Sequence, residues 1–446
     1  MFHESRRKIM MRTKIVWMLI ALLCAGSLLL AGGTADAQDK LSIWLGYGET
    51  LPAFEFVKAK FEEKYPDIEV EILTFSLRDF EAKLASSMPT GAGPDLLALH
   101  DFLFPRYYDN DYLEPLPDDL AQIVTDPEKM NQTYTDIVSR EGVAYGVPYW
   151  TGRSTLFYNL DHFEEAGLSG PPETVEQLWE YAEKLVQKDA SGEVTRAGIT
   201  MRLTGPSGGI QKFGYLYYQM AGEQIFEPGE EPGTVRVTLE DNLDIAVQAL
   251  LDRVNHLHGE RKVDDWTLKH DAQGFASGVA SMLLRETWAI AFIKKNGPDI
   301  NFSTALMPKG KVRGAFNYIE ILSVSNQSEL KEETWEFIRM LQEQEALNVL
   351  LTESGYSPLR RDRDFAWFVE ENPKYKAVMQ DFEGYQQYLE APNTAYEEMT
   401  TRVGEVLQEA YRDAALVDNP EGCKEVILEM QEVAEDILSF NGILAE

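Results

Sequence analysis

Strand-like and helix-like stretches alternate between residues 41 and 100. The segments 41–45, 68–73 and 95–100 are short apolar or alternating runs of the kind that forms strands. The segments between them, 53–65 and 80–88, carry apolar residues at helical spacing. This alternation predicts an α/β fold with a largely parallel sheet.

The later part of the chain is more helical. Residues 315–325 are strand-like, and 332–351 predicts one amphipathic helix with Trp335, Ile338 and Leu341 on a single stripe. The segment 355–359 interrupts the pattern, and the sequence beyond it favours helices up to residue 446. The loop 227–233 is rich in Pro, Gly and Glu and predicts a surface turn.

The first 37 residues have the pattern of an export signal. A basic segment precedes an apolar run, 15–30, and Ala35-Asp36-Ala37 is a small-x-small cleavage site, so the mature chain is expected to start at Gln38. The apolar run is shorter than the roughly 20 residues that a membrane span needs. Leu23 before Cys24 disfavours a lipoprotein, and a twin-arginine pattern at 5–10 leaves the export route and the start codon, Met1 or Met11, open.

Charge and cysteine content narrow the class of protein. The chain has 41 Lys and Arg against 74 Asp and Glu, a net charge of −33. Such a surface repels nucleic acid and anionic lipid. Cys423 is the single cysteine beyond the signal, so no internal disulfide forms. The mature length is too great for one core and predicts two lobes.

Several segments resemble a known family. Residues 145–150, 156–168 and 171–174 are similar to the segment where the chain first crosses between the lobes of maltose-type extracellular solute-binding proteins, the capture subunits of sugar ABC importers. Residues 61–70 and 94–97 resemble the opening strand-helix-strand signature of that family.

The resemblance implies a two-lobe periplasmic-binding-protein-like fold of type II, whose discontinuous lobes are joined by a three-segment hinge. On this basis residues 38–148 with 318–352 form one lobe, and residues 149–317 with 353–446 form the other. It also implies a monomer in the periplasm, without cofactor or metal. Such a protein captures a mono- or oligosaccharide by hinge closure and delivers it to ABC permease subunits.

A sugar site needs flat aromatic rings for C–H faces and carboxylates, amides or Arg for hydroxyls. Ligands of open α/β sheets lie beyond the carboxyl ends of strands. These rules select Tyr47 and Glu49 after the first strand, His100 and Asp101 after the third, and Tyr149, Trp150 and Arg153 at the first crossing.

The resemblance adds further candidates. Residues 282–288 are similar to a methionine-to-tryptophan motif in which the tryptophan commonly stacks on sugar, which makes Trp288 the strongest single candidate. Glu286 departs from the glycine usual in that motif. Asp111 replaces the glycine that usually precedes the segment 112–116 in the family. Positions near the second and third crossings complete the predicted ligand site: Asn317, Tyr318, Tyr356 and Arg360.

Two of these candidates are arginines with an alternative role. A structural ion pair is the expected state of Arg153 and Arg360 in this acid-rich chain. If both faced the cleft, an anionic sugar such as a uronate would become attractive, because Arg matches a carboxylate bidentately.

Two common enzyme signatures, His-Glu-x-x-His and the Walker pattern, are missing from the sequence. The glycine-rich segment 205–209 has no phosphate-loop pattern and is interpreted as a turn. His256 and His258 are two residues apart and would lie on different helix faces, which disfavours a zinc site. Counting acids does not exclude a secreted carbohydrate-active hydrolase. The same fold binding a sugar acid, a polyol, a phosphodiester or another small solute is a second alternative.

Overall fold

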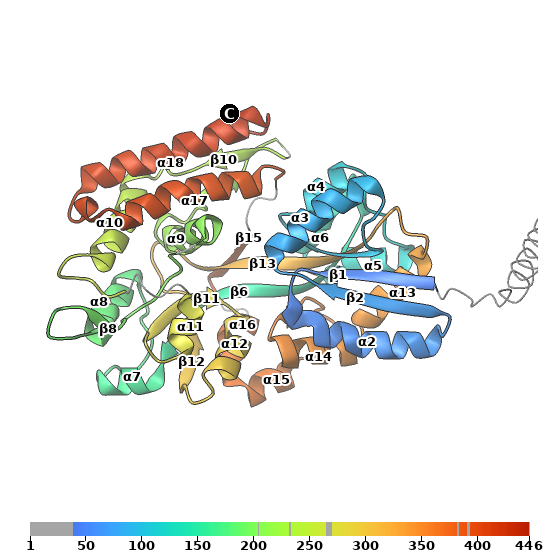
Figure 1. The fold of residues 1–446 in the computed structure, drawn as a ribbon, viewed down its shortest axis with the longest axis horizontal. Coiled ribbons are helices and arrows are strands. Elements are labelled where there is room, and N and C mark those ends of the chain that lie inside the picture. Colours follow the sequence, from blue (N-terminus) through green and yellow to red (C-terminus); the bar gives the residue numbers. More distant parts are fainter. Residues whose placement is uncertain are drawn as a thin grey trace, which may run out of the picture.

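The computed structural model describes residues 39–203, 205–231, 233–264, 270–380, 383–389 and 393–445. The predicted export signal lies outside these residues. The described chain forms two α/β lobes that lie side by side, with strands running from one into the other (Figure 1). The two-lobe α/β fold is the one predicted.

The first lobe is built on a mixed sheet, parallel in its first three strands and antiparallel where the chain returns, so the prediction of a largely parallel sheet holds only for the opening strands. Strand β1 (Asp39–Leu45) pairs in parallel with β2 (Ile68–Thr74) and with β3 (Leu96–His100), as the sequence pattern predicted. The sheet continues from β3 into β13 (Arg313–Val324) and β6 (Val147–Asn159), giving the order β2-β1-β3-β13-β6. Every residue of β3 is buried, which explains its wholly apolar start.

Helices cover both faces of this sheet. α2 (Leu51–Lys64) packs against α13 (Lys331–Leu341) and α14 (Gln344–Ser354), with Phe54 and Phe61 contacting Phe337 at ring distances of 6.2 and 5.5 Å. The lobe also contains α3 (Leu77–Ser87), α4 (Phe104–Asp109), α5 (Asp118–Thr125), α6 (Gln132–Val138), the hairpin β4 (Ser139–Arg140) and β5 (Val143–Ala144), and two 3-10 turns, η1 (Gly48–Thr50) and η2 (Met88–Thr90).

The single helix predicted over 332–351 is wrong, because the structure divides it into α13 and α14. A helix continuing past Leu341 would turn Glu345 and Asn348 toward the core. Glu345 is instead exposed and pairs with Lys60, and α14 begins in a new phase that buries apolar residues. The break therefore lets each helix bury its own apolar stripe.

Three segments of chain join the lobes. β6 and β13 pair antiparallel, with Asn317 opposite Arg153, Tyr318 opposite Gly152 and Ile319 opposite Thr151. β14 (Ser357–Pro358) pairs with β6 at Thr151 and Trp150, so the third crossing lies beside the other two. The predicted lobe boundaries at 148/149 and 317/318 fall inside β6 and β13, and that at 352/353 falls near the end of α14.

The second lobe extends the same two strands. β11 (Met282–Glu286) and β12 (Phe302–Ala305) pair antiparallel with β6, and β15 (Tyr385–Leu389) pairs in parallel with β13. β15 corrects the prediction of uninterrupted helix-forming sequence there. β9 (Phe226–Pro228) and β10 (Val235–Val237) form a hairpin around the predicted turn.

Helices dominate the second lobe. α9 (Pro206–Ala221), α10 (Leu243–Leu257), α17 (Tyr396–Arg412) and α18 (Pro420–Phe440) enclose a separate apolar core that includes Cys423. The remaining elements are α7 (Leu160–Glu165), α8 (Val175–Leu185), β7 (Gln187–Lys188), β8 (Val194–Arg196), α11 (Asp271–Ala276), α12 (Ala289–Asn296), α15 (Ala366–Glu371), η3 (Pro373–Tyr375), α16 (Lys376–Met379) and η4 (Ala414–Leu416). Within the described ranges, no helix combines the length and the apolar character that a membrane crossing requires.

The hinge strands tolerate little added volume at Gly152. A Cβ atom there would lie 2.2 Å from Cζ of Tyr318, which faces it across the strand pair. We expect Gly152→Ala to lower the free energy of unfolding by about 1 to 3 kcal/mol through overpacking. Urea denaturation would measure the change.

A matched glycine substitution serves as the control. A Cβ atom at Gly209 in α9 would meet nothing within 4 Å. Gly209→Ala should therefore leave stability unchanged or raise it by up to about 1 kcal/mol, since Ala favours helix. Equal urea midpoints for Gly152→Ala and the parent would contradict the packing argument.

Candidate functional site

A cavity of about 400 Å³ lies between the two lobes, and we call it the front cavity. The first lobe contributes Tyr47, Ser76, Leu77, Arg78, Glu81, His100 and Phe102. The hinge and the second lobe contribute Arg202, Ser207, Gly208, Gln211, His270, Arg285, Glu286, Trp288, Phe316, Tyr318, Tyr396, Glu397 and Thr400.

The carboxyl ends of β1 and β3 place Tyr47 and His100 in this cavity. Because parallel strands end at the same edge of a sheet, the two side chains meet, with ring centroids 4.4 Å apart and the Tyr47 hydroxyl 3.4 Å from His100 Nδ1. Phe102 stacks on His100 at 4.7 Å. Burial lowers the pKa of His100 to about 3, so its ring is neutral at physiological pH.

On the opposite wall, Glu286 at the end of β11 organises the side chains around Trp288. Its carboxylate accepts hydrogen bonds from Lys212 Nζ, from the Tyr215 hydroxyl and, at 3.0 Å, from Trp288 Nε1. Burial by itself would raise the pKa of Glu286, but Lys212 and Arg285 outweigh it and hold that pKa below its usual range. The residue that departs from the family pattern therefore fixes the indole ring.

Trp288 is half-buried, and the cation of Arg285 lies 5.0 Å from its ring centre. With the indole N–H bonded to Glu286, the ring offers an apolar surface to the cavity. Such a surface suits the C–H face of a flat apolar or sugar-like group.

Contacts around Arg78 join the lobes across the front cavity. Arg78, near the start of α3, donates to Glu397 Oε1 at 2.8 Å and to Ser207 Oγ at 2.6 Å in the other lobe, and to Glu81 at 2.9 Å in its own. We call these contacts the Arg78 bridge. The ring of Phe102 also stacks on Tyr396 at 4.9 Å. The lobes are therefore in direct contact over the cavity.

The structure brings four of the twelve predicted ligand residues to the front cavity: Tyr47, His100, Trp288 and Tyr318. The other eight lie outside its lining: Glu49, Asp101, Tyr149, Trp150, Arg153, Asn317, Tyr356 and Arg360. Their roles in binding stay predictions, and their positions follow from the geometry of the hinge.

Trp150 and Tyr356 form the layer behind the cavity wall. Both are fully buried and stack at 3.8 Å with an interplanar angle of 10°. Tyr47 packs edge-on against Trp150 at 5.3 Å, and Tyr318 does so at 5.7 Å. These two residues therefore support the rings that line the cavity.

Arg153 and Asn317 lie on the other face of the hinge. Consecutive side chains of a strand point to opposite faces, so Arg153 and its partner Asn317 point away from Gly152 and Tyr318. Arg153 and Arg360 line a different cavity, and Arg360 donates two hydrogen bonds to Asp362 at 2.8 and 2.7 Å. The condition set for an anionic sugar, that both arginines face the cleft, is not met in this arrangement.

Three further candidates do not line the cavity, Glu49 and Asp101 after strand ends and Tyr149 within β6. Glu49 is exposed in η1. Asp101 is buried, and burial raises its pKa to about 7. Tyr149 is fully buried against Phe54, with ring centroids 6.0 Å apart.

Sequence analysis missed the residues supplied by helix starts. The glycine-rich segment 205–209 was interpreted as a turn, yet it opens α9 and places Ser207, Gly208 and Gln211 in the cavity. A Cβ atom at Gly208 would lie 2.7 Å from Cζ of Arg202, so this glycine lets the guanidinium approach. Proline at the start of a helical pattern was the available signal.

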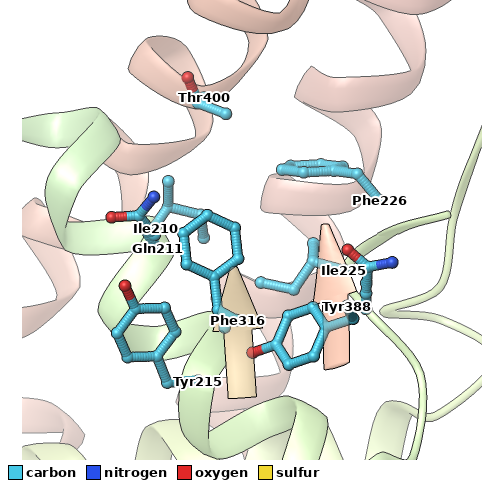
Figure 2. Close-up of a pocket in the computed structure, with 10 residues that line it drawn as sticks. Ile210, Gln211, Tyr215, Ile225, Phe226, Phe316, Tyr388 and Thr400 are labelled. Atoms are coloured by element: carbon cyan, nitrogen blue, oxygen red, sulfur yellow. The ribbon is translucent and has the colours of Figure 1, made fainter. Parts of the chain in front are cut away.

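A narrow apolar pocket adjoins the front cavity and shares Gln211, Phe316 and Thr400 with it. Figure 2 shows the rings of Tyr215, Phe316 and Tyr388 beside one another at its base. Its volume of about 30 Å³ is roughly that of one water molecule. The pocket is too small for a sugar ring.

The histidines that invited a zinc hypothesis have other partners. His256 stacks on Trp179 at 4.3 Å and contacts Asp252 O at 2.6 Å, and His258 contacts Tyr411 O at 2.9 Å. Among the described residues, no group of three or more His, Cys, Asp or Glu could hold a metal ion.

Comparison with known proteins assigns the family. Residues 57–377, more than half of the chain, match the family described as bacterial extracellular solute-binding protein. The chain belongs to this family. This solute-binding protein is 25% identical to a lactose-binding protein of Rhizobium radiobacter over 305 residues, covering 66% of this chain and 67% of that one. It is 23% identical to an arabinooligosaccharide-binding protein of Halalkalibacterium halodurans, covering 77% and 75%.

Solved structures share the fold. An ABC substrate-binding protein from Listeria monocytogenes, in complex with cycloalternan, matches with a TM-score of 0.74 at 18% identity, covering 91% of this chain and 99% of that one. A solute-binding protein from Thermotoga lettingae, bound to α-D-tagatose, matches with a TM-score of 0.72 at 22% identity, covering 90% and 100%. This solute-binding protein therefore has the two-lobe fold of sugar-binding relatives.

A buried carboxyl group at the hinge makes the stability of the folded protein depend on pH. Glu320 is fully buried and accepts a hydrogen bond from Trp150 Nε1 at 2.8 Å. Burial raises its pKa from 4.5 to about 8. The folded state thus holds a proton that the unfolded state releases, and the stability present below pH 4.5 is lost as pH rises through about 8.

Glu320→Gln keeps a neutral acceptor for Trp150. We expect the melting temperature of this variant, relative to the parent, to rise steadily between pH 5 and pH 8.5. The free energy of unfolding of the variant, relative to the parent, rises by about 1.4 kcal/mol for each pH unit in which Glu320 is ionised only in the unfolded parent. Melting curves across this range, taken in matched buffers, would measure it. A difference that does not vary with pH would contradict a neutral Glu320.

Proposed function

We propose that this solute-binding protein captures a carbohydrate in the front cavity and delivers it to an ABC permease. The observation that carries the proposal is a cavity lined from both lobes by aromatic rings and by charged groups that can pair with hydroxyls. The names of the relatives, which bind lactose and arabino-oligosaccharides, support a carbohydrate as the ligand.

Each wall of the cavity offers a different kind of contact. The ring of Trp288 supplies an apolar face, and Tyr47 and Tyr318 supply further rings with hydroxyls. The neutral ring of His100 and the carboxyl group of Glu397 can both pair with sugar hydroxyls. A hydroxyl-rich ring needs this combination of faces and edges.

The volumes of two neighbouring cavities support a ligand of one to a few sugar units. The front cavity of about 400 Å³ lies in the range of small-molecule sites. A second cavity of about 360 Å³ shares Phe102, Tyr396 and Glu397 with it. An oligosaccharide could therefore extend past the stacked pair of Phe102 and Tyr396.

Closure of the lobes is the proposed mechanism of capture. A ligand that touches both lobes stabilises the closed form relative to the open one, and the permease distinguishes the two. The Arg78 bridge and the stack of Phe102 on Tyr396 are contacts that opening would break. Tyr47 and His100 on one side and Trp288 on the other would then form the two half-sites.

We further propose that the protein is monomeric, is located in the periplasm after cleavage near Ala37, and releases its ligand unchanged. The carboxylates of the front cavity support binding without hydrolysis. Glu286 is held ionised by Lys212 and Arg285, and Glu397 accepts from Arg78. A glycosidase needs one of its two carboxyl groups free to transfer a proton to the leaving oxygen.

The carbohydrate hypothesis is tested with Trp288. Isothermal titration against a panel of mono- and oligosaccharides should find at least one ligand, and Trp288→Ala should weaken its binding by roughly tenfold to a hundredfold through loss of the apolar face. Trp367→Ala is the matched control, because Trp367 is also half-buried but lies on α15 outside the cavity.

Two outcomes would refute the proposal. No heat with any carbohydrate, together with binding of a non-carbohydrate solute, would assign a different ligand class. Shorter products after incubation with labelled oligosaccharides would establish hydrolysis.

A separate prediction concerns the role of the Arg78 bridge in holding the lobes together. Arg78→Met should increase the radius of gyration of the ligand-free protein in X-ray scattering, because the closed form loses its ion pair. It should also weaken ligand binding a fewfold, since a half-exposed ion pair contributes little. Lys83→Met, on the same helix but outside the cavity, should change neither quantity. An unchanged radius for Arg78→Met would show that the bridge does not hold the lobes together.

A further inference from the structure

Another cavity, of about 760 Å³, lies on the opposite face of the hinge from the front cavity, and we call it the rear cavity. Thr151 and Arg153 of β6 and Ser357 of β14 contribute to its lining. These residues alternate with Trp150 and Gly152, whose neighbours form the front wall. The pleat of the hinge strands thus separates the two cavities.

The rear cavity concentrates positive charge in an acidic protein. Five cationic residues line it, namely Arg153, Arg360, Arg361, Arg363 and Lys376, against the two carboxylates of Asp364 and Glu370. The chain as a whole has 74 acidic and 41 basic residues. Asp362 neutralises one of the cations by pairing with Arg360. The remaining excess makes this cavity attractive to anions.

Two donors in the lining have hydrogen-bonding capacity that the described residues do not use. Ser357 is only 7% exposed, and its hydroxyl has no partner among them. Arg363 donates weakly to Gln342 O at 3.4 Å, and its buried Nε has no partner in the same set. A buried donor without an acceptor is costly, so an acceptor that enters the cavity would relieve that cost.

We propose that the rear cavity binds a small polyanion carrying two or more carboxylate or phosphate groups. Guanidinium groups match the oxygens of carboxylate and phosphate bidentately, and three arginines follow one another at 360, 361 and 363. Lys376 of α16 lines the same cavity and adds a point charge. A cavity of this volume accommodates such an anion.

Titration calorimetry with citrate, and separately with inorganic phosphate, tests the proposal on the full-length mature protein. Ionic strength is held constant with sodium chloride, since an acidic protein responds to any salt. We expect citrate to bind, and the double variant Arg363→Gln, Lys376→Gln to weaken binding at least about tenfold through loss of two charged donors. Comparison of the two probes distinguishes a carboxylate from a phosphate ligand.

A matched control separates this site from general charge effects. The double variant Arg412→Gln, Lys424→Gln removes the same charges at exposed positions of α17 and α18 and should bind citrate normally. Lys376→Gln alone, at an exposed position, serves if the double variant does not fold.

The proposal is overturned if neither anion binds at constant ionic strength, or if the rear-cavity variants bind like the parent.

Discussion

Consecutive side chains along β6 and β13 point to opposite faces of the hinge, and the arrangement of both cavities depends on this alternation. Gly152 and Tyr318 meet on the front face, and Arg153 and Asn317 meet on the rear face. A shift of one residue in the pairing would exchange the two sets. β14 fixes the third crossing to the same register, by pairing Ser357 with Thr151. The ligand-facing residues are therefore decided by strand pairing before any contact with a ligand.

The front face of the hinge carries a tightly packed aromatic layer. Trp150 stacks on Tyr356, and Tyr47 and Tyr318 pack against this pair to form part of the cavity wall. Glu320 lies beneath the layer and accepts the indole N–H of Trp150. A buried carboxyl group is costly when ionised, and its raised pKa is the consequence. Packing thus orients the rings, and one polar group in the interior is retained to satisfy Trp150.

Sequence patterns predicted the parts of this structure that have a simple period or position. The strands β1, β2 and β3 follow from their apolar runs, and Tyr47 and His100 reach the cavity because they end parallel strands. The faces of the hinge were not predictable, since 12 of the 13 residues of β6 are buried and no apolar–polar alternation marks a side. The sequence therefore could not tell that Arg153 lines the rear cavity instead of the front cavity. The contributions of α9 and α17 were not predicted, because a proline such as the one at the start of α9 marks where a helix begins but not what its first turn faces.

The rear cavity shares its strands with the front cavity, so we expect occupancy of one to be coupled to closure of the other. Its lining includes Asn131 beside α6 of the first lobe and Gln387 on β15 of the second. A rotation that separates α3 from α9 and α17 at the front must alter the distance between these walls at the rear. An anion that fits the rear cavity while the Arg78 bridge is formed would favour the closed form, and by reciprocity a front-cavity ligand would then strengthen anion binding. Both effects would act through the same three crossings, in which β6 pairs with β13 and with β14.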